Sequence, residues 1–580
     1  MFLPTPPALL RIVVVAVALV AMSCRLSAAE PTPAVVPNAS ACGDSESCQA
    51  AVAGEQQRAL NQARRAAERA GRDLNTEREI DDWANCARYA AQAIAAVGNL
   101  GSDAASLGTS CTDEFLRLAL REGRRWSPGT TRVGGLKLDV EFRNLSPYLQ
   151  DQVSLIRASD VPMNVFANKR YARAGYGIPL VVQSARCHSG PVCDLLPREG
   201  VFRGATAWIE SVPDDVHADL RLVVADPLRE TLLRAGDHRY ALALDTSAPY
   251  AVGANSSSLR RLGVYGLLGG EEIGRRAGVY LLEDYDPNRR PIVMIHGLAA
   301  SPLNFARISN AIWGDPQLRA RFQVWHVIYQ TDAPMMILRR RIQDYLDRVW
   351  NAVDPEGDDP ARHGIVLIGH SMGGIIARLL CVESGDVMWN TAFTVPPAQM
   401  PGKPEDVAAI EGMLFTHPYP GVTRTIFLAS PHHGSPAADA WYGRLFQNLI
   451  GRGVPELRLL QRYTREHPEV VSDAVRETYE QAKVNSITTL RAAQPMLAAS
   501  ESLLPQPGIR YHTIAGSLPR QAPPGDGIVP LDSAKLPGAE STLVVKYGHQ
   551  LYDSDEVIAE VVRILHADIA EQDNAADPPR

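Results

Sequence analysis

The stretch IVLIGHSMGG, residues 365–374, predicts a buried strand, a sharp turn and the start of a helix. Its first four residues are apolar, as expected for a central strand of a parallel sheet that is covered on both faces. Gly369 and Gly373 lie two residues before and two residues after Ser371. So tight a turn needs small residues there, because other backbone segments come close to their Cα atoms. The motif therefore presents the Ser371 hydroxyl at the end of a strand, where a nucleophile can act.

Strand-like and helix-like segments alternate on both sides of this motif, over residues 275–572. Such alternation is the signature of a mainly parallel sheet with helical crossovers, so we predict an α/β fold for this region. The expected strands are Val279–Leu282, Pro291–Ile295, Val324–Tyr329, Gly364–Ile368, Thr423–Ala429, Arg510–Ile514 and Thr542–Val545. The expected helices are Met335–Val353, Gly373–Glu383 and Glu556–Ile569.

The first half of the chain has a different pattern and no motif that carries chemistry. Residues 47–130 are rich in Ala, Arg, Glu, Gln and Leu, which predicts helices that are interrupted near Gly98–Gly108. Residues 131–260 have short β-branched runs between Gly, Pro and Asp, which favours a β-rich, sandwich-like domain. The expected helices are Gln56–Leu74 and Glu79–Val97, and the expected strands are Leu136–Phe142, Leu220–Val224 and Tyr240–Leu244.

An apolar run, Ile12–Met22, lies near the N-terminus. It is too short to cross a bilayer, so we interpret it as part of a signal peptide. Cleavage after a small-x-small pattern would make residues 1–29 the signal peptide. Alternatively, a lipobox-like segment would make residues 1–23 a lipoprotein signal and Cys24 a lipid-bearing membrane anchor. Either outcome predicts export to a bacterial cell envelope, as a periplasmic protein or an outer-membrane lipoprotein, with residues 30–46 as a linker.

The cysteines agree with export. Cys381 falls in a predicted apolar helix, where we expect a buried free thiol. Six others form an even set, which indicates disulfides in an exported chain, although six cysteines allow 15 connectivities. No Cys-x-x-Cys or His-x-x-x-His spacing accompanies them, so no metal site is expected. The pairs closest in sequence are Cys42 with Cys48, Cys86 with Cys111, and Cys187 with Cys193.

Composition and charge exclude two broad classes of protein. Hydrophobic residues make up 46% and charged residues 21% of the 580 residues, which argues against a disordered chain. The net charge of -7 and the lack of a basic run give no reason to expect a nucleic-acid partner. The length predicts two or three domains.

A nucleophilic serine needs a base to take its proton and an acid to orient that base. In α/β folds with a nucleophile on such a turn, the acid and then the histidine follow the serine along the chain. The candidate acid is Asp526, which lies between two glycines, and the runner-up is Asp532. The candidate base is His549, after the last expected strand. Asp526 would orient His549, and His549 would accept the Ser371 proton. The other histidines that we weighed, His432, His433, His512 and His566, have positions that favour packing or solvent-facing roles.

An oxyanion hole needs two backbone N–H groups that point at the developing negative charge. Met372, directly after the nucleophile, is the first candidate donor. Leu298, in the His296–Ala299 loop after an expected strand, is the second. We assign His296 a structural role, because a histidine at a strand end commonly holds its loop by hydrogen bonds.

Residues from about Gly278 to the C-terminus resemble the bacterial esterase and lipase branch of the α/β-hydrolase superfamily. This resemblance covers about half of the chain and implies an α/β-hydrolase fold and ester hydrolysis without a cofactor. Some lipases of this family bind a structural calcium ion through an acidic residue just after the histidine, but Gln550 occupies that position here. The similar motifs are His296–Ala299, Gly369–Gly374, Ser430–Ser435, Asp526–Val529 and Gly548–His549.

Residues 386–500 predict a cap inserted into this fold. Asp386–Gly421 is Pro-rich and irregular, whereas Ala437–Ala499 has a mostly helical pattern. An apolar stripe in the second part fits either a lid over the active site or packing on the core. The stripe consists of Trp441, Leu445, Phe446, Leu449 and Ile450.

Three functions fit the sequence. The leading hypothesis is a serine carboxylic-ester hydrolase, an esterase or lipase, that acts on a lipid or acyl ester through an acyl-enzyme. The second is an acyltransferase or amidase that uses the same three residues. The third, of another class, is a non-catalytic envelope binding or scaffold protein, and the complete set of triad candidates argues against it.

Overall fold

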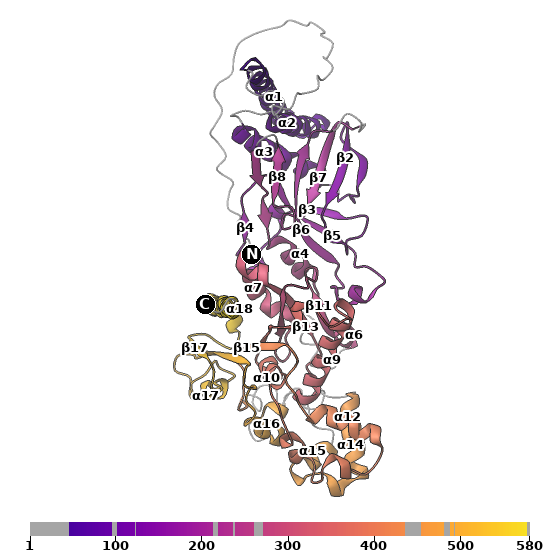
Figure 1. The fold of residues 1–580 in the computed structure, drawn as a ribbon, viewed down its shortest axis with the longest axis vertical. Helices are drawn as coiled ribbons and strands as arrows, with labels where there is room; N and C mark the ends of the chain where they lie inside the picture. The colour runs from indigo at the N-terminus through magenta and orange to yellow at the C-terminus, as the bar shows by residue number, and fades with distance from the viewer. Residues whose placement is uncertain are drawn as a thin grey trace, which may run out of the picture.

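The computed structural model describes residues 46–95, 101–121, 123–212, 218–235, 238–259, 271–435, 454–480, 488–491 and 494–576. The molecule is elongated, with three helices at one end, a sheet below them, a second sheet near the middle and a group of helices at the other end (Figure 1). The predicted signal segment, Cys24 and the linker lie outside the described residues. Within these residues no helix is long and apolar enough to cross a membrane.

The three N-terminal helices pack side by side, because each has a face of small residues. They are α1 (Glu46–Arg72), α2 (Glu77–Ala95) and α3 (Gly101–Ala119). The third helix begins at Gly101, inside the segment where the sequence predicted a break. A disulfide between Cys86 and Cys111 joins α2 to α3.

The helices cover one face of a six-stranded sheet with the order β1-β2-β7-β6-β5-β3. Alternate residues of the strands, such as Leu138, Ala207 and Leu222, pack against them. We expected a sandwich of two sheets here; the layer that faces this sheet is helical instead. The strands are β1 (Gly129–Val133), β2 (Leu136–Arg143), β3 (Ser154–Arg157), β5 (Ile178–Ser184), β6 (Val201–Glu210) and β7 (Leu220–Ala225).

Smaller elements complete this part of the chain. The expected strand Tyr240–Leu244 is divided, because Leu242 and Ala243 instead pair with Tyr176. A second disulfide joins Cys187 to Cys193. These elements are β4 (Ala172–Arg173), β8 (Leu232–Ala235), β9 (His238–Ala241), β10 (Leu244–Asp245), α4 (Ala248–Ser256) and α6 (Glu271–Arg276).

The two disulfides have the connectivity that the spacing favoured. The third expected pair includes Cys42, which lies outside the described residues. Cys381 is free and buried, as expected. Disulfides form and persist in oxidising compartments, so the two bonds are consistent with an extracytoplasmic location.

The seven-stranded sheet has the order β11-β13-β12-β14-β15-β16-β17. Its edge strand β11 runs antiparallel to β13, and the other neighbours are parallel. This confirms an α/β fold with a mainly parallel sheet, preceded by helices and a β-rich part. The strands are β11 (Gly278–Leu281), β12 (Arg290–Ile295), β13 (Phe322–Ile328), β14 (Ile365–His370), β15 (Val422–Leu428), β16 (Arg510–Gly516) and β17 (Ser541–Val545).

Helices cover both faces of this sheet. On one face α9 (Met335–Val353) and α10 (Met372–Leu379) contribute to a core with β12 and β14. On the other face α7 (Ala306–Gly314) and α18 (Asp555–Ala576) do so. Two short helices, α8 (Pro316–Arg321) and α17 (Leu531–Ala534), lie in connecting segments.

The second of these cores continues into the N-terminal part of the molecule. Val181 of β5 and Phe202 of β6 belong to the same buried cluster as Ile292 of β12. Helix α4 links them, and the ring of its Tyr250 lies 4.5 Å from that of Trp313 in α7. The two sheets are therefore connected by continuous apolar packing.

The described helices of the predicted cap form the end of the molecule that is remote from the six-stranded sheet (Figure 1). Two helices occur in the segment that we expected to be irregular, and one of them has Pro404 at its first position, which suits a helix start. The apolar stripe at Trp441–Ile450 lies outside the described residues. The helices are α11 (Val387–Ala392), α12 (Pro404–Leu414), α14 (Pro455–Glu466), α15 (Asp473–Glu480) and α16 (Pro495–Ser500).

Candidate active site

Ser371 occupies the turn between β14 and α10. Its backbone has φ 54° and ψ −125°, a region that residues with a Cβ rarely adopt. Its N–H donates to the carbonyl of Leu428 in the next strand at 2.9 Å, which fixes the turn to the sheet. Ser371 therefore lies on a sharp, strained strand-to-helix turn at the carboxyl edge of the parallel sheet.

Close backbone approach explains the glycines around Ser371. A Cβ on Gly373 would lie 2.1 Å from the carbonyl oxygen of Ile295 and 2.5 Å from that of His296. Because both neighbours are backbone atoms, they could not rotate away. Gly374 is also restricted, since a Cβ there would lie 1.7 Å from Ser430 Oγ and 2.6 Å from Ser430 Cβ. We did not predict this role of Gly374 from the sequence, although the doubled glycine was a signal.

Ser371, His549 and Asp526 lie in one chain of hydrogen bonds. His549 Nε2 is 2.9 Å from Ser371 Oγ, and His549 Nδ1 is 2.8 Å from Asp526 Oδ2. The other oxygen of Asp526 accepts from the backbone N–H groups of Ile528 and Val529 at 2.9 and 2.7 Å. With Nδ1–H donating to the carboxylate, Nε2 is free to accept the serine proton.

The alternative acid and bases lie elsewhere. Asp532 is exposed in the first turn of α17, and Asp526 takes the position beside His549. His512 contacts Ser541 and the buried Arg424, and His566 contacts Asp315. The ring of His432 is buried against Phe427, and the His433 ring lies 3.4 Å from Glu501.

The loop after β12 lies against Ser371. A Cβ on Gly297 would lie 2.9 Å from the Ser371 Cβ, so only glycine allows this approach. Among the described residues, no backbone carbonyl accepts from the N–H of Leu298 or Met372. The next residue, Ala299, has φ 53° and donates its N–H to Thr331 Oγ1 at 3.2 Å. This contact of Thr331, on the segment after β13, had no sequence signal.

Two buried histidines hold the loops of the site. Burial lowers the pKa of His296 to about 4 and that of His370 to about 3, so both are neutral at neutral pH. The His296 ring stacks on Tyr329 at 4.4 Å, and the Tyr329 hydroxyl donates to the His296 carbonyl. His370 Nε2 donates to the backbone carbonyl of His549 at 2.9 Å. The role of His370 in fixing the His549 loop was not predicted.

A polar cavity of about 390 Å³ adjoins the loop after β12. Its wall includes Ala299 and Ser301 of that loop and Tyr552 of the segment after His549. The Tyr552 hydroxyl accepts from Asn304 Nδ2 at 2.8 Å. Polar groups therefore line part of this cavity.

One group of carboxylates among the described residues is close enough to share a cation: Asp354, Asp358 and Asp359. The Asp354 oxygens already accept from the Arg362 guanidinium and from backbone N–H groups, including that of Gly357 at 3.0 Å. These contacts explain the cluster as a structural turn, and we assign it no metal.

Several solved structures are similar to about half of the chain. A lipase of Bacillus licheniformis in its mature form has 17% identity, with 49% of this chain and 94% of that chain covered and a TM-score of 0.29. A lipase-esterase related protein from Clostridium acetobutylicum has 12% identity, 50% and 99% coverage and a TM-score of 0.26. Esterase B of Lactobacillus rhamnosis has 14% identity, 52% and 83% coverage and a TM-score of 0.27. No protein-family model and no curated protein matches the chain.

Proposed function

We propose that the chain is a serine hydrolase that cleaves carboxylic esters. In this proposal Ser371 is the nucleophile, His549 the general base, and Asp526 the residue that orients His549. The observation that carries it is the hydrogen-bond chain from Ser371 Oγ through His549 to Asp526, with distances of 2.9 and 2.8 Å. Both distances are those of normal hydrogen bonds, so a proton can pass from the hydroxyl to the imidazole.

The reaction would proceed in two halves. Ser371 Oγ attacks the ester carbonyl carbon while His549 Nε2 takes the hydroxyl proton. The bond from that carbon to the alcohol oxygen then breaks, and His549 returns the proton to the departing alcohol. Water attacks the resulting acyl-enzyme after losing a proton to His549, which then protonates Ser371 Oγ as the carboxylic acid leaves.

The N–H groups of Leu298 and Met372 are our proposed oxyanion donors. They flank the nucleophile, and neither is used by a backbone carbonyl in the described structure. Each donor of this kind lowers the barrier by about 3 kcal/mol in comparable sites. The tight contact between Gly297 and Ser371 supports this placement, because it holds the Leu298 peptide near the reacting carbon.

The substrate that we propose is an acyl or lipid ester. An amidase or acyltransferase would share the acyl-enzyme and would differ in the bond cleaved or in the acceptor. A series of p-nitrophenyl esters of increasing chain length, compared with the matching anilides and with added alcohol acceptors, would separate these activities. Preferential cleavage of the esters with water as the acceptor is the expected result.

Labelling by a fluorophosphonate probe tests the nucleophile directly. We expect stoichiometric labelling of the full chain, complete loss in Ser371→Ala, and normal labelling in Ser533→Ala. Ser533 is a matched control, because it is a buried serine near the site whose hydroxyl donates to Gly434. Absence of labelling in folded protein, or labelling that persists in Ser371→Ala, would refute the proposal.

We also propose that the protein is exported and that Cys24 can carry a lipid anchor. The disulfides Cys86–Cys111 and Cys187–Cys193 support an oxidising destination. Fractionation of cells that express the chain, or its Cys24→Ser variant, tests the anchor. Membrane association that depends on Cys24 is expected, and association that is unchanged in Cys24→Ser would contradict it.

A further inference from the structure

A cavity of about 780 Å³ lies between the two sheets of the molecule. Phe202 of β6 and Tyr250 of α4 line it from the N-terminal side, and Leu282 and Trp313 line it from the side of the seven-stranded sheet. Its volume is within the range of small-molecule sites, about 300–1,000 Å³. None of the three proposed triad residues is part of its described wall, so it is a separate site.

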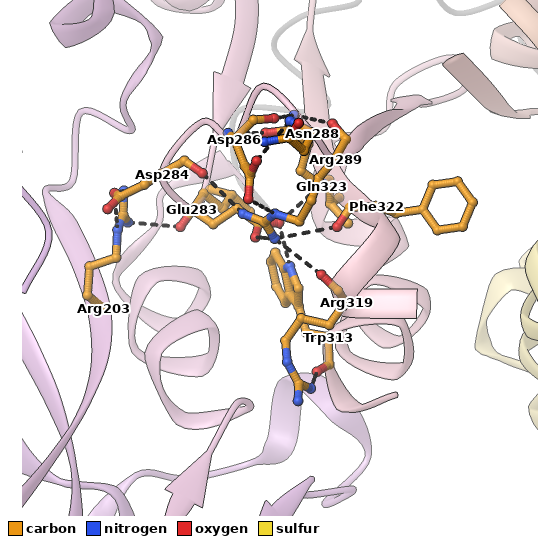
Figure 2. Close-up of polar contacts among 12 residues, drawn as sticks. Arg203, Glu283, Asp284, Asp286, Asn288, Arg289, Trp313, Arg319, Phe322 and Gln323 are labelled. Atoms are coloured by element: carbon orange, nitrogen blue, oxygen red, sulfur yellow. Dashed lines mark hydrogen bonds and ion pairs between the residues drawn. The ribbon is translucent and has the colours of Figure 1, made fainter. Parts of the chain in front are cut away.

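The acidic groups of the cavity wall are already bound by other groups. Glu283 accepts from Arg289 and, at 2.9 Å, from the indole N–H of Trp313. Asp284 accepts from Arg203 Nε at 2.9 Å (Figure 2). These contacts leave little unpaired negative charge on this side of the cavity.

The remaining carboxylates of the wall are also bound, and Asp286 accepts from the N–H of Asn288 and from Arg289 Nε at 2.9 and 3.2 Å. Glu199 lies 2.8 Å from Arg276 Nη1. One Asp245 oxygen binds Arg170, and the other accepts backbone N–H groups of the turn that starts α4. Asp226 accepts from the N–H of Leu228 at 2.9 Å and lies 3.6 Å from Arg229.

Three arginines of the wall, Arg173, Arg198 and Arg319, form no ion pair within the described part of the chain, and Arg198 donates to the backbone carbonyl of Arg275. Arg319 donates to the carbonyl of Trp313, and Arg173 donates to that of Leu242 at 3.3 Å. Burial and the charge of Arg173 lower the pKa of Arg319, which shows that the two guanidinium groups repel each other. Both remain charged at neutral pH, because an arginine pKa is far above 7.

Glu283 and Asp315 attract Arg319 through space and partly offset the lowering of its pKa, but neither forms an ion pair with it in the described structure. Asp315 caps α8 through the N–H groups of Gln317 and Leu318 at 2.9 and 3.1 Å, and its other oxygen lies 2.8 Å from His566 Nε2. Arg173 and Arg319 are therefore two positive charges of the wall that no described carboxylate contacts directly.

We propose that this cavity binds an organic anion with an apolar chain. The anionic group would lie between Arg173 and Arg319, and the chain would contact Phe202, Tyr250 and Leu282. Guanidinium groups bind carboxylate and phosphate oxygens with paired, charge-assisted hydrogen bonds, and an anion between them would remove their mutual repulsion. The aromatic and aliphatic wall would shield the chain from water.

Calorimetric titration of the full chain tests this site with three probes below their micelle concentrations. The probes are dodecanoate, dodecyl phosphate and neutral dodecanol. We expect one anion per chain, with binding at least about tenfold tighter than that of dodecanol, the effect of roughly one charge-assisted contact. Tighter binding of dodecanoate would identify a free fatty acid as the ligand, and tighter binding of dodecyl phosphate would identify a phosphate ester.

Arginine variants then locate the site. Arg173→Gln and Arg319→Gln should each weaken binding of the preferred anion about tenfold. Arg340→Gln should leave binding unchanged, because Arg340 is a half-exposed arginine of α9 that pairs only with Asp344 in the described structure. Arg173 is exposed, so its variant is informative even if Arg319→Gln fails to fold. Failure of both anions to bind, equal binding of dodecanol, or undiminished binding in Arg173→Gln would overturn the proposal.

Discussion

The two sheets of this molecule differ in how they meet their surroundings. Strands β12, β13 and β14 are buried along their whole length, since helices cover both faces of the seven-stranded sheet. Strand β2 of the six-stranded sheet alternates between buried and partly exposed residues. The charged side chains within the central strands of the seven-stranded sheet, Arg290 of β12 and Arg424 of β15, are buried in ion pairs with Asp568 of α18, so accessible polar groups lie beyond the strand ends. Ser371 and Leu298 follow the carboxyl ends of β14 and β12 for that reason.

The six-stranded sheet instead carries its charges along the strands. Arg143 of β2 pairs with Glu141 at 2.7 Å and with Glu210 of β6 at 2.8 Å. Arg221 of β7 pairs with Asp139 at 2.7 Å. These charges satisfy one another, which makes them structural. Charge alone thus does not mark a reactive site, and our proposal rests instead on the hydrogen-bonded Ser–His–Asp array at a strand end.

The largest expected effect comes from breaking that array. Asp526→Asn should lower ester turnover about 10⁴-fold with little change in folding, because an asparagine favours the wrong tautomer of His549. Steady-state kinetics of the purified variant would measure the loss. Asp532→Asn is the matched control, since Asp532 lies on the next short helix and is exposed. Comparable losses in the two variants would contradict our assignment of the acid.

The next effect tests whether the two sheets fold as one unit. Tyr250→Ala removes a buried ring that stacks on Phe166 and meets Trp313 edge-on. We expect the free energy of unfolding to fall by about 3–5 kcal/mol, as for other buried aromatic residues, and the unfolding of the two parts to separate. Urea unfolding followed by circular dichroism and tryptophan fluorescence would show this. Coincident transitions with a loss below about 1 kcal/mol would argue against a shared core.

A lower pH should destabilise the seven-stranded part of the molecule. His296 and His370 have folded-state pKa values of about 4 and about 3, below the usual value of 6.5. The unfolded chain therefore binds more protons below pH 6.5, and stability falls as the pH falls. Each histidine should lower the free energy of unfolding by about 2 kcal/mol at pH 5 and should have no effect above pH 7.

Unfolding measured from pH 7 to pH 5 would test this, with His370→Gln as the variant. A shallower dependence on pH is expected in His370→Gln, and an identical slope would count against the burial argument.

The smallest effect is expected on the helices that cover the six-stranded sheet. A Cβ at Gly71 of α1 meets nothing within 4 Å, so Gly71→Ala should stabilise the protein by less than about 1 kcal/mol through helix propensity. Gly108→Ala in α3 is the counterpart, because its Cβ would lie 3.2 Å from that of Ala90. Thermal unfolding should show a small gain for the first variant and none for the second. A rise in thermal stability for Gly108→Ala alone would contradict the close packing of Gly108 against Ala90.

The seven-stranded sheet could be predicted because its signals are local. Each expected strand from Val279 to Val545 lies within a few residues of an observed one, and α9 begins and ends as predicted. Apolar runs and the glycines at the elbow encode these elements directly. The proposed triad was found in the same way, from motifs in a fixed order, and the structure brings its three side chains together.

Other features depend on partners that are distant in the sequence. The alternation in β2 predicts one buried face, but it does not say whether a sheet or a helix covers that face. The contact of Thr331 with Ala299 N–H joins residues 32 positions apart, and that of Arg203 with Asp284 joins residues 81 apart. No local pattern carries such pairs. Helix α12 was missed because its Pro404 was taken as a sign of irregular structure.

The backbone of Ser371 has an evolutionary consequence. At φ 54° and ψ −125° the conformation itself suits glycine, whereas the proposed chemistry needs a hydroxyl. Selection for folding and selection for activity therefore act in opposite directions on this one codon. Under the proposed function, a descendant that lost the need for activity would gain stability by a change to glycine at this position.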